Sequence, residues 1–146
     1  MFARGQLSKI IRTGKPIAPA AFSDAFEPMW ARIAALNLVD WQRQLESVNA
    51  LWEKIDIPSE SLRKLRVLDI ASGAGILSFA LAKKHASVRV TMIDRPMVLT
   101  YTKQIAEKMD VASQITLVPG DPFNFDVRAQ SVDLVVLGNV TQYLNT

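Results

Sequence analysis

A turn of small residues, Ser72 to Gly75, is the part of the sequence best suited to bind a ligand. It joins an expected strand at residues 65–70 to an expected helix at residues 75–85. Backbone N–H groups at the start of a helix attract ligands, and glycines let a ligand approach them closely. The two glycines of this turn, Gly73 and Gly75, therefore predict a site for a small-molecule cofactor, although their pattern alone also fits a dinucleotide.

Two further elements could bind an adenosine group. Asp94 follows the expected strand at residues 88–93, at the distance from the glycine turn that is typical of a carboxylate accepting ribose hydroxyl groups. This acid fits both NAD and S-adenosylmethionine. Asp121 and Phe123 follow the next expected strand, at residues 114–118, where a carboxylate could accept the adenine amino group and a ring could cover the base. This third element favours S-adenosylmethionine.

These motifs require strands and helices that alternate along the chain. Four short runs of almost continuous apolar residues predict strands covered on both faces, and helical patterns separate them. Such an alternation indicates an α/β fold with a parallel sheet and right-handed crossovers. The expected strands are residues 65–70, 88–93, 114–118 and 132–137, and the expected helices between them are residues 75–85 and 96–109.

The segment before the first strand is expected to be helical. Residues 29–38 predict one helix, and Asp40 is placed to cap a second helix at its N-terminus. The second helix is amphipathic, with apolar residues at spacings of three and four. We expect the three tryptophan rings, Trp30, Trp41 and Trp52, to pack against the main domain or a dimer partner.

Composition excludes several classes of chemistry. The chain has 146 residues, no cysteine and a single histidine, His85, so it cannot form a thiolate zinc site, a disulfide framework, a cysteine nucleophile or a metal centre of several histidines. No metal site is therefore expected. No apolar run is long enough to span a membrane, and no secretory signal is evident, so we expect one globular cytoplasmic protein.

Positive charge is concentrated near the N-terminus. Residues 1–23 carry four basic side chains and no acid, whereas the rest of the chain is almost neutral, and the whole chain has a net charge of +3. A basic arm of this kind could contact phosphates or act as a targeting segment, but such termini are commonly just solvated. The neutral body argues against a nucleic-acid partner.

Residues 65–145 resemble the class I S-adenosylmethionine-dependent methyltransferases, whose motifs occur here in the same order. Within that superfamily, the chain is most similar to small-molecule O-methyltransferases related to acetylserotonin and hydroxyneurosporene methyltransferases. The resemblance implies a Rossmann-like sheet with strands in the order 3-2-1-4, formed by residues 65–146 and preceded by a helical segment at residues 24–64. The stretches that carry it are Asp94-Arg95-Pro96, Gly120-Asp121-Pro122-Phe123 and residues 133–140.

The resemblance also implies which residues bind the cofactor, whose product after transfer is S-adenosylhomocysteine. By that likeness, Asp69, Gly73 and Gly75 line the methionine end of S-adenosylmethionine, Asp94 binds the ribose, Asp121 and Phe123 hold the adenine, and Gly138 and Asn139 flank the site beneath the methyl group. Ala71 stands at the first glycine of the family's usual turn, a change that many relatives share, and it completes the predicted cofactor-binding set with Ser72, Arg95 and Pro122.

The sequence departs from that family at the catalytic base. Where those O-methyltransferases have a histidine after the fourth strand, this chain has Gln142, which can position a substrate but cannot take its proton. In-line positioning can supply much of the acceleration, so a carbon, nitrogen or ionised oxygen acceptor needs no base. We therefore predict an S-adenosylmethionine-dependent methyltransferase acting on a small molecule. The alternatives are a non-catalytic methyltransferase-like subunit and an NAD-dependent oxidoreductase domain.

The family fold has seven strands, whereas this sequence provides four. The fourth strand, at residues 132–137, would be left as an open apolar edge, which is an expected association site. We therefore expect the N-terminal portion of a longer or split enzyme, which forms a homo-oligomer or associates with a C-terminal portion.

Overall fold

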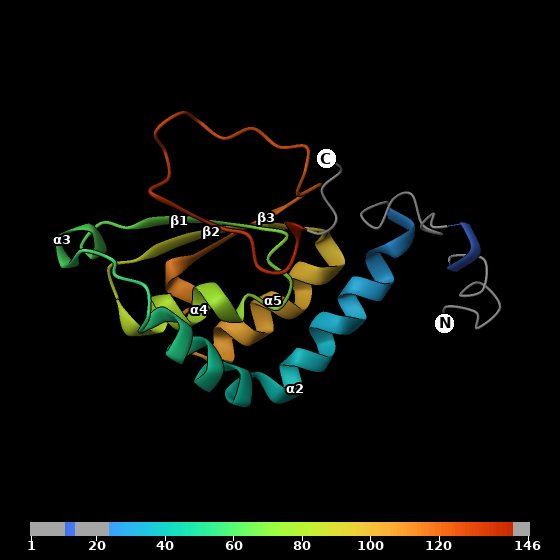
Figure 1. Cartoon of the computed structure of the whole chain (residues 1–146), viewed down its shortest axis with the longest axis horizontal. Coiled ribbons are helices and arrows are strands. Elements are labelled where there is room, and N and C mark those ends of the chain that lie inside the picture. The colour runs from blue at the N-terminus through green and yellow to red at the C-terminus, as the bar shows by residue number, and fades with distance from the viewer. Residues whose placement is uncertain (1–10, 14–23, 142–146) are drawn as a thin grey trace.

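The computed structural model describes residues 11–13 and 24–141, so most of the basic arm lies outside the described residues (Figure 1). A 3-10 helix at Asp24–Phe26 leads into the first long helix, and a second 3-10 turn at Ala112–Gln114 precedes the third strand. The helices are α2 (Glu27–Trp52), α3 (Ser59–Leu62), α4 (Ile76–Lys84) and α5 (Pro96–Lys108), and the strands are β1 (Arg66–Ile70), β2 (Arg89–Asp94), β3 (Ile115–Pro119) and β4 (Leu134–Val136).

The four strands form one parallel sheet in the order β3-β2-β1-β4, which confirms the predicted fold class and topology. An ion pair fixes the start of β4 against β1: the Arg66 guanidinium donates to both carboxylate oxygens of Asp133, at 2.8 and 3.0 Å. Because all strands run the same way, their carboxyl ends meet at one edge of the sheet. That edge is where open α/β sheets bind ligands.

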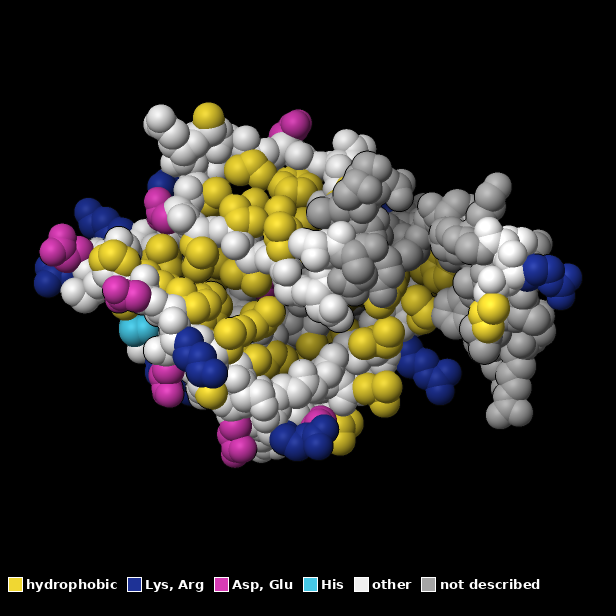
Figure 2. Space-filling view, viewed as in Figure 1, with side chains coloured by type: hydrophobic (Ala, Val, Ile, Leu, Met, Phe, Trp, Pro, Cys, Tyr) yellow, Lys and Arg dark blue, Asp and Glu magenta, His cyan; other side chains and the backbone are white. Residues whose placement is uncertain are grey.

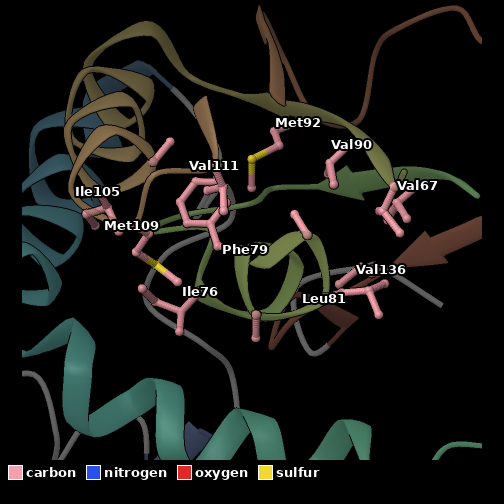
Figure 3. Packing of buried hydrophobic residues seen from close by; sticks show 14 of the residues in the cluster. Val67, Ile76, Phe79, Leu81, Val90, Met92, Ile105, Met109, Val111 and Val136 are labelled. Carbon is pink, nitrogen blue, oxygen red and sulfur yellow. The ribbon is translucent and has the colours of Figure 1, made fainter. Parts of the chain in front are cut away.

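The main core lies between the sheet and the helices α4 and α5, which cover one face of it, and α2 packs across these two helices on the side away from the sheet (Figure 1). Phe79 of α4 is fully buried at its centre. Its ring lies among Met92 of β2, Ile105 of α5, and Met109 and Val111, which follow that helix (Figure 3). Burial of one such side chain contributes about 1.5–3 kcal/mol, so this cluster provides much of the stability that holds the edge of the sheet in place.

The opposite face of the sheet is covered by no helix among the described residues, and only the loop between β3 and β4 arches over it (Figure 1). Val118 is 37% exposed, Val135 47% and Leu137 44%. The prediction that all four strands are covered on both faces is therefore wrong for β3 and β4. Their apolar residues alternate between the core and this second face, which is half exposed.

Helix α2 spans 26 residues and has a kink at Asp40, where φ is −116° and ψ is 17°, so two helical segments meet where the second helix was expected to begin. The Asp40 carboxylate accepts a hydrogen bond from the Arg43 side chain at 3.1 Å, and its role as an N-cap stays a prediction. Trp41 and Trp52 pack against the main core, as predicted. Within the described ranges, no helix has the length and hydropathy needed to cross a bilayer.

Candidate functional site

A cavity of about 310 Å³ lies between α2 and the carboxyl ends of β1 and β2. The turn that follows β1 forms its floor, and α2 forms the opposite wall. A third part of the wall comes from the segment after β4. The lining residues are Trp30, Ile33, Ala34, Asn37, Gln44 and Val48 of α2, Asp69, residues 71–77, Asp94, Val98, and residues 138–140.

The turn between β1 and α4 depends on its two glycines. Gly73 has φ of +54° and Gly75 has φ of +78°. Residues with a Cβ atom rarely adopt this left-handed region, whereas glycine adopts it readily. A Cβ at Gly75 would lie 2.6 Å from Met92 Cε and 2.7 Å from the Phe79 ring, whereas a Cβ at Gly73 would meet no atom within 4 Å. Gly75 is therefore required by the core, and Gly73 leaves open space at the cavity.

Hydrogen bonds from two other elements fix this turn. The hydroxyl of Thr102, on α5, is fully buried and donates to the Gly73 carbonyl oxygen at 2.6 Å. The Gly73 N–H donates to Asp94 Oδ2 at 2.7 Å. The Ser72 Oγ atom is buried, and no described residue hydrogen-bonds to it. Because a buried hydroxyl without a partner is costly, Ser72 marks a place where a ligand would complete the site.

Asp94 ends β2 and is only 6% exposed. Its two carboxylate oxygens accept the backbone N–H groups of Gly73 and Arg95, both at 2.7 Å. Burial raises the pKa of Asp94, and the two N–H donors and the Arg95 charge partly offset that effect, while the charge of Glu27 adds to it. Each carboxylate oxygen has a second lone pair, so Asp94 can still accept hydroxyl donors from the cavity.

Asp69 lies in β1 beside Asp94 and is 2% exposed. Ser78 of α4 donates a hydrogen bond to its Oδ2 at 2.6 Å. Burial raises the pKa of Asp69 to about 7, which the Ser78 hydrogen bond partly opposes and the charge of Asp94 reinforces. Two buried carboxyl groups on neighbouring strands therefore face one cavity, and a cationic ligand would be stabilised there.

The predicted adenine-binding residues lie next to the cavity but do not line it. Asp121, Pro122 and Phe123 follow β3, outside the cavity walls. The Asp121 carboxylate is 3.4 Å from Arg95 Nη2, and it accepts the Phe123 backbone N–H at 3.0 Å. Asp121, Pro122 and Phe123 thus lie one strand beyond Asp94 in the sheet order. Phe123 is 39% exposed, so its ring is accessible to a ligand that extends from the cavity toward β3.

The segment after β4 closes the far side of the cavity. Gly138 and Asn139 line it, and Asn139 has φ of +59°. A Cβ at Gly138 would lie 2.7 Å from Leu77 Cδ1 of α4, so glycine permits this close approach. Gln142, the residue at the expected base position, lies outside the described residues.

Comparison with known proteins identifies the fold to which this site belongs. The sequence profile described as a methyltransferase domain matches residues 67–146, which is more than half of the chain. The chain belongs to this methyltransferase-domain family. No curated protein sequence matches it significantly.

Solved structures share the fold of this methyltransferase domain at low sequence identity. A protein from Nostoc punctiforme is 22% identical, with a TM-score of 0.73, over 93% of this chain and 38% of that chain. An O-methyltransferase family 2 protein from Planctomyces limnophilus, in complex with apigenin, is 21% identical, with a TM-score of 0.64, over 95% of this chain and 39% of that chain. Human N-acetylserotonin methyltransferase, in complex with SAM, is 20% identical, with a TM-score of 0.63, over 93% of this chain and 39% of that chain. The chain thus spans about two fifths of the length of these proteins.

The sequence patterns did not reveal that α2 forms one wall of the cavity. Trp30, Ile33, Asn37, Gln44 and Val48 all line the cavity, and Trp30 also packs beside the second, smaller cluster of buried residues. Their spacings of three, four and seven place them on one helical face. That spacing could have revealed a shared face, but only the packing of α2 decides that this face meets the ends of β1 and β2.

Proposed function

We propose that this methyltransferase domain binds S-adenosylmethionine in the cavity and takes part in methyl transfer to a small-molecule acceptor. The observation that carries the proposal is the cavity itself, where a glycine turn and two buried carboxyl groups, Asp69 and Asp94, meet at the ends of adjacent parallel strands. An adenosine joined to a zwitterionic amino-acid group fits such a site, because its hydroxyl and ammonium groups are donors and the carboxyl groups of Asp69 and Asp94 are acceptors.

We propose a position for each part of the cofactor from the order and direction of the strands. Asp94 at the end of β2 would accept the ribose hydroxyls, and the exposed Phe123 beyond β3 would cover the adenine beside Asp121. Asp69 at β1 would face the ammonium group, and the open space at Gly73 would admit the backbone of the cofactor. We propose that the other predicted contacts, from Ala71, Ser72, Gly75, Arg95, Pro122, Gly138 and Asn139, support these positions.

The bound cofactor supplies a methyl group on a sulfonium, which is already a good leaving group. The chain's own residues then have to hold the acceptor in line with that methyl group and exclude water. Gly138 and Asn139, on the far wall of the cavity, are placed to shape this position. Gln142 cannot take a proton, so we propose an acceptor that reacts at carbon, nitrogen or an ionised oxygen. The apigenin complex of one related fold supports a small-molecule acceptor.

Calorimetric titration with S-adenosylhomocysteine tests the cofactor assignment. We expect binding by the unmodified chain and loss of binding in Asp94→Ala, while Asp56→Ala, at an exposed position outside the cavity, binds normally. Far-UV circular dichroism checks that both variants are folded. A preference for NADH over S-adenosylhomocysteine, or unaltered binding in Asp94→Ala, would refute the assignment. Binding without turnover of any acceptor, in the longest available form of the protein, would favour a non-catalytic subunit, for which Gln142 is the supporting residue.

We also propose that the half-exposed face of the sheet associates with further polypeptide, either a second copy or a C-terminal portion. The support is the exposed apolar side chains on this face, Val118 of β3, Val135 of β4 and Leu137 after β4. In addition, the outer edge of β4 pairs with no strand in the part of the chain that the structure describes. Hydrophobic side chains gather over the sheet in this view (Figure 2). A monomeric chain that unfolds cooperatively and binds no hydrophobic dye would contradict this proposal.

A cytoplasmic location is a further proposal, supported by the absence of cysteine from the sequence. Fractionation of the source cells, followed by immunoblotting, would test it.

A further inference from the structure

Two amide side chains on the α2 wall have no part in the proposed contacts with ribose and adenine. Asn37 and Gln44 both line the cavity. The Gln44 amide donates to Asn37 Oδ1, and the Asn37 amide donates to the Ile33 carbonyl oxygen at 3.1 Å. Among the described residues, these bonds use one N–H of each amide. A second N–H on each side chain can therefore donate to a ligand.

Anchors at both ends of α2 indicate which part of the cavity Gln44 faces, and its hydrogen bond to Asn37 keeps the two amides together. Near its start, Glu27 Oε1 accepts the backbone N–H of Met97, at the beginning of α5, at 2.7 Å. At its end, the Trp52 ring N–H donates to the Leu77 carbonyl oxygen of α4 at 2.8 Å. With a rise of about 1.5 Å per residue, Gln44 lies about 12 Å along the axis from Trp52 and about 26 Å from Glu27. Gln44 is thus nearer to the start of α4 than to the start of α5.

The order of the strands gives the orientation of the cofactor relative to this wall. Helix α5 follows Asp94, and β3 lies on the far side of β2 from β1. With the ribose at Asp94 and the adenine toward β3, the amino-acid end has to extend the other way, over the turn between β1 and α4. That turn is the part of the cavity beside the start of α4, which is also the part nearest to Gln44.

We propose that Asn37 and Gln44 bind the carboxylate of the cofactor's amino-acid end, together with the hydroxyl of Ser72. This inference rests on the proposed function and adds the α2 wall to the site. A zwitterionic amino-acid group needs both acceptors and donors. Asp69 provides the acceptor for the ammonium group. The two amides and Ser72 Oγ, which has no hydrogen-bond partner among the described residues, provide donors for the carboxylate.

A pair of ligands that differ only in this group tests the proposal. S-adenosylhomocysteine has the amino-acid end, and 5′-methylthioadenosine lacks it while keeping the adenosine and the sulfur. We expect Gln44→Leu to weaken S-adenosylhomocysteine binding by about 10- to 100-fold, the usual effect of losing a hydrogen bond to a charged group, and to leave 5′-methylthioadenosine binding unchanged. Gln42→Leu, at an exposed position of α2 outside the cavity, is the matched control and should bind both ligands normally.

A second variant keeps the test decisive if Gln44→Leu does not fold. Gln44→Glu has nearly the same shape and places a negative charge where the ligand carboxylate should lie, so it too should weaken S-adenosylhomocysteine alone. Equal weakening of both ligands, or unchanged S-adenosylhomocysteine binding in a folded variant, would overturn the role of the amides while leaving the proposed function intact. If the unmodified chain binds neither ligand, the proposed function fails, and this inference fails with it.

Discussion

Alanine at Gly75 should mainly lower the stability of the fold, whereas alanine at Gly73 should mainly weaken ligand binding. At Gly75, a methyl group would lie 2.6–2.8 Å from atoms of Met92 and Phe79. The Phe79 ring is fully buried and cannot move aside without disturbing the core. At Gly73, a methyl group would meet nothing within 4 Å and would occupy the open space of the cavity. The first substitution disturbs the fold, and the second blocks the ligand.

The magnitudes follow from these contacts. Both glycines have positive φ, which costs an L-residue about 1–2 kcal/mol. Overpacking adds about 1–3 kcal/mol at Gly75 only. We therefore expect Gly75→Ala to lower the free energy of unfolding by about 2–5 kcal/mol and Gly73→Ala by about 1–2 kcal/mol. We take the clash between the new methyl group at position 73 and the ligand to cost about as much as the overpacking at Gly75. Binding of S-adenosylhomocysteine then weakens by about 10- to 100-fold.

Urea unfolding followed by circular dichroism measures the first effect, and calorimetry measures the second. Each variant is the control for the other, because both change one glycine of the same turn to alanine. Equal losses of stability would show that the space around Gly75 does not determine the cost. Normal S-adenosylhomocysteine binding by Gly73→Ala would show that the ligand does not pass over this turn.

Two further predictions concern groups buried around the cavity. Thr102→Val leaves the Gly73 carbonyl oxygen without its buried donor, so we expect the free energy of unfolding to fall by about 1–3 kcal/mol. Thr102→Ser keeps the hydroxyl and should lose less stability in the same urea titration. Asp69 keeps its proton in the folded state up to about pH 7, while the unfolded chain releases it near the ordinary value of 3.8. The folded state therefore binds more protons between these values, so this group's contribution to stability falls as the pH rises from about 4 to 7. Asp69→Asn should remove this fall, and a stability difference between the two proteins that is the same at pH 5 and pH 8 would contradict the reasoning.

Local features of the sequence were sufficient to predict the strands, the turn and many of the residues that line the cavity. Apolar runs of strand length separated by helical patterns specify a parallel α/β sheet, because the period of the side chains and the need for crossovers leave few alternatives. Gly73, Gly75 and Asp94 could be predicted to share one site because they stand at strand ends and helix starts, and all three line the cavity. These positions follow from the order of elements along the chain.

The α2 wall and the condition of the second sheet face were decided only by the tertiary structure. The sequence indicates that α2 has an apolar face, but not that Asn37 and Gln44 border the same cavity as a turn about 30 residues later in the chain. Nor does it indicate that Asp121 pairs with Arg95, or that Val135 and Leu137 are half exposed. Each of these facts depends on contacts between segments that are distant in sequence. Helical or strand periodicity specifies which residues share a face, whereas only the packing of whole elements determines what that face meets.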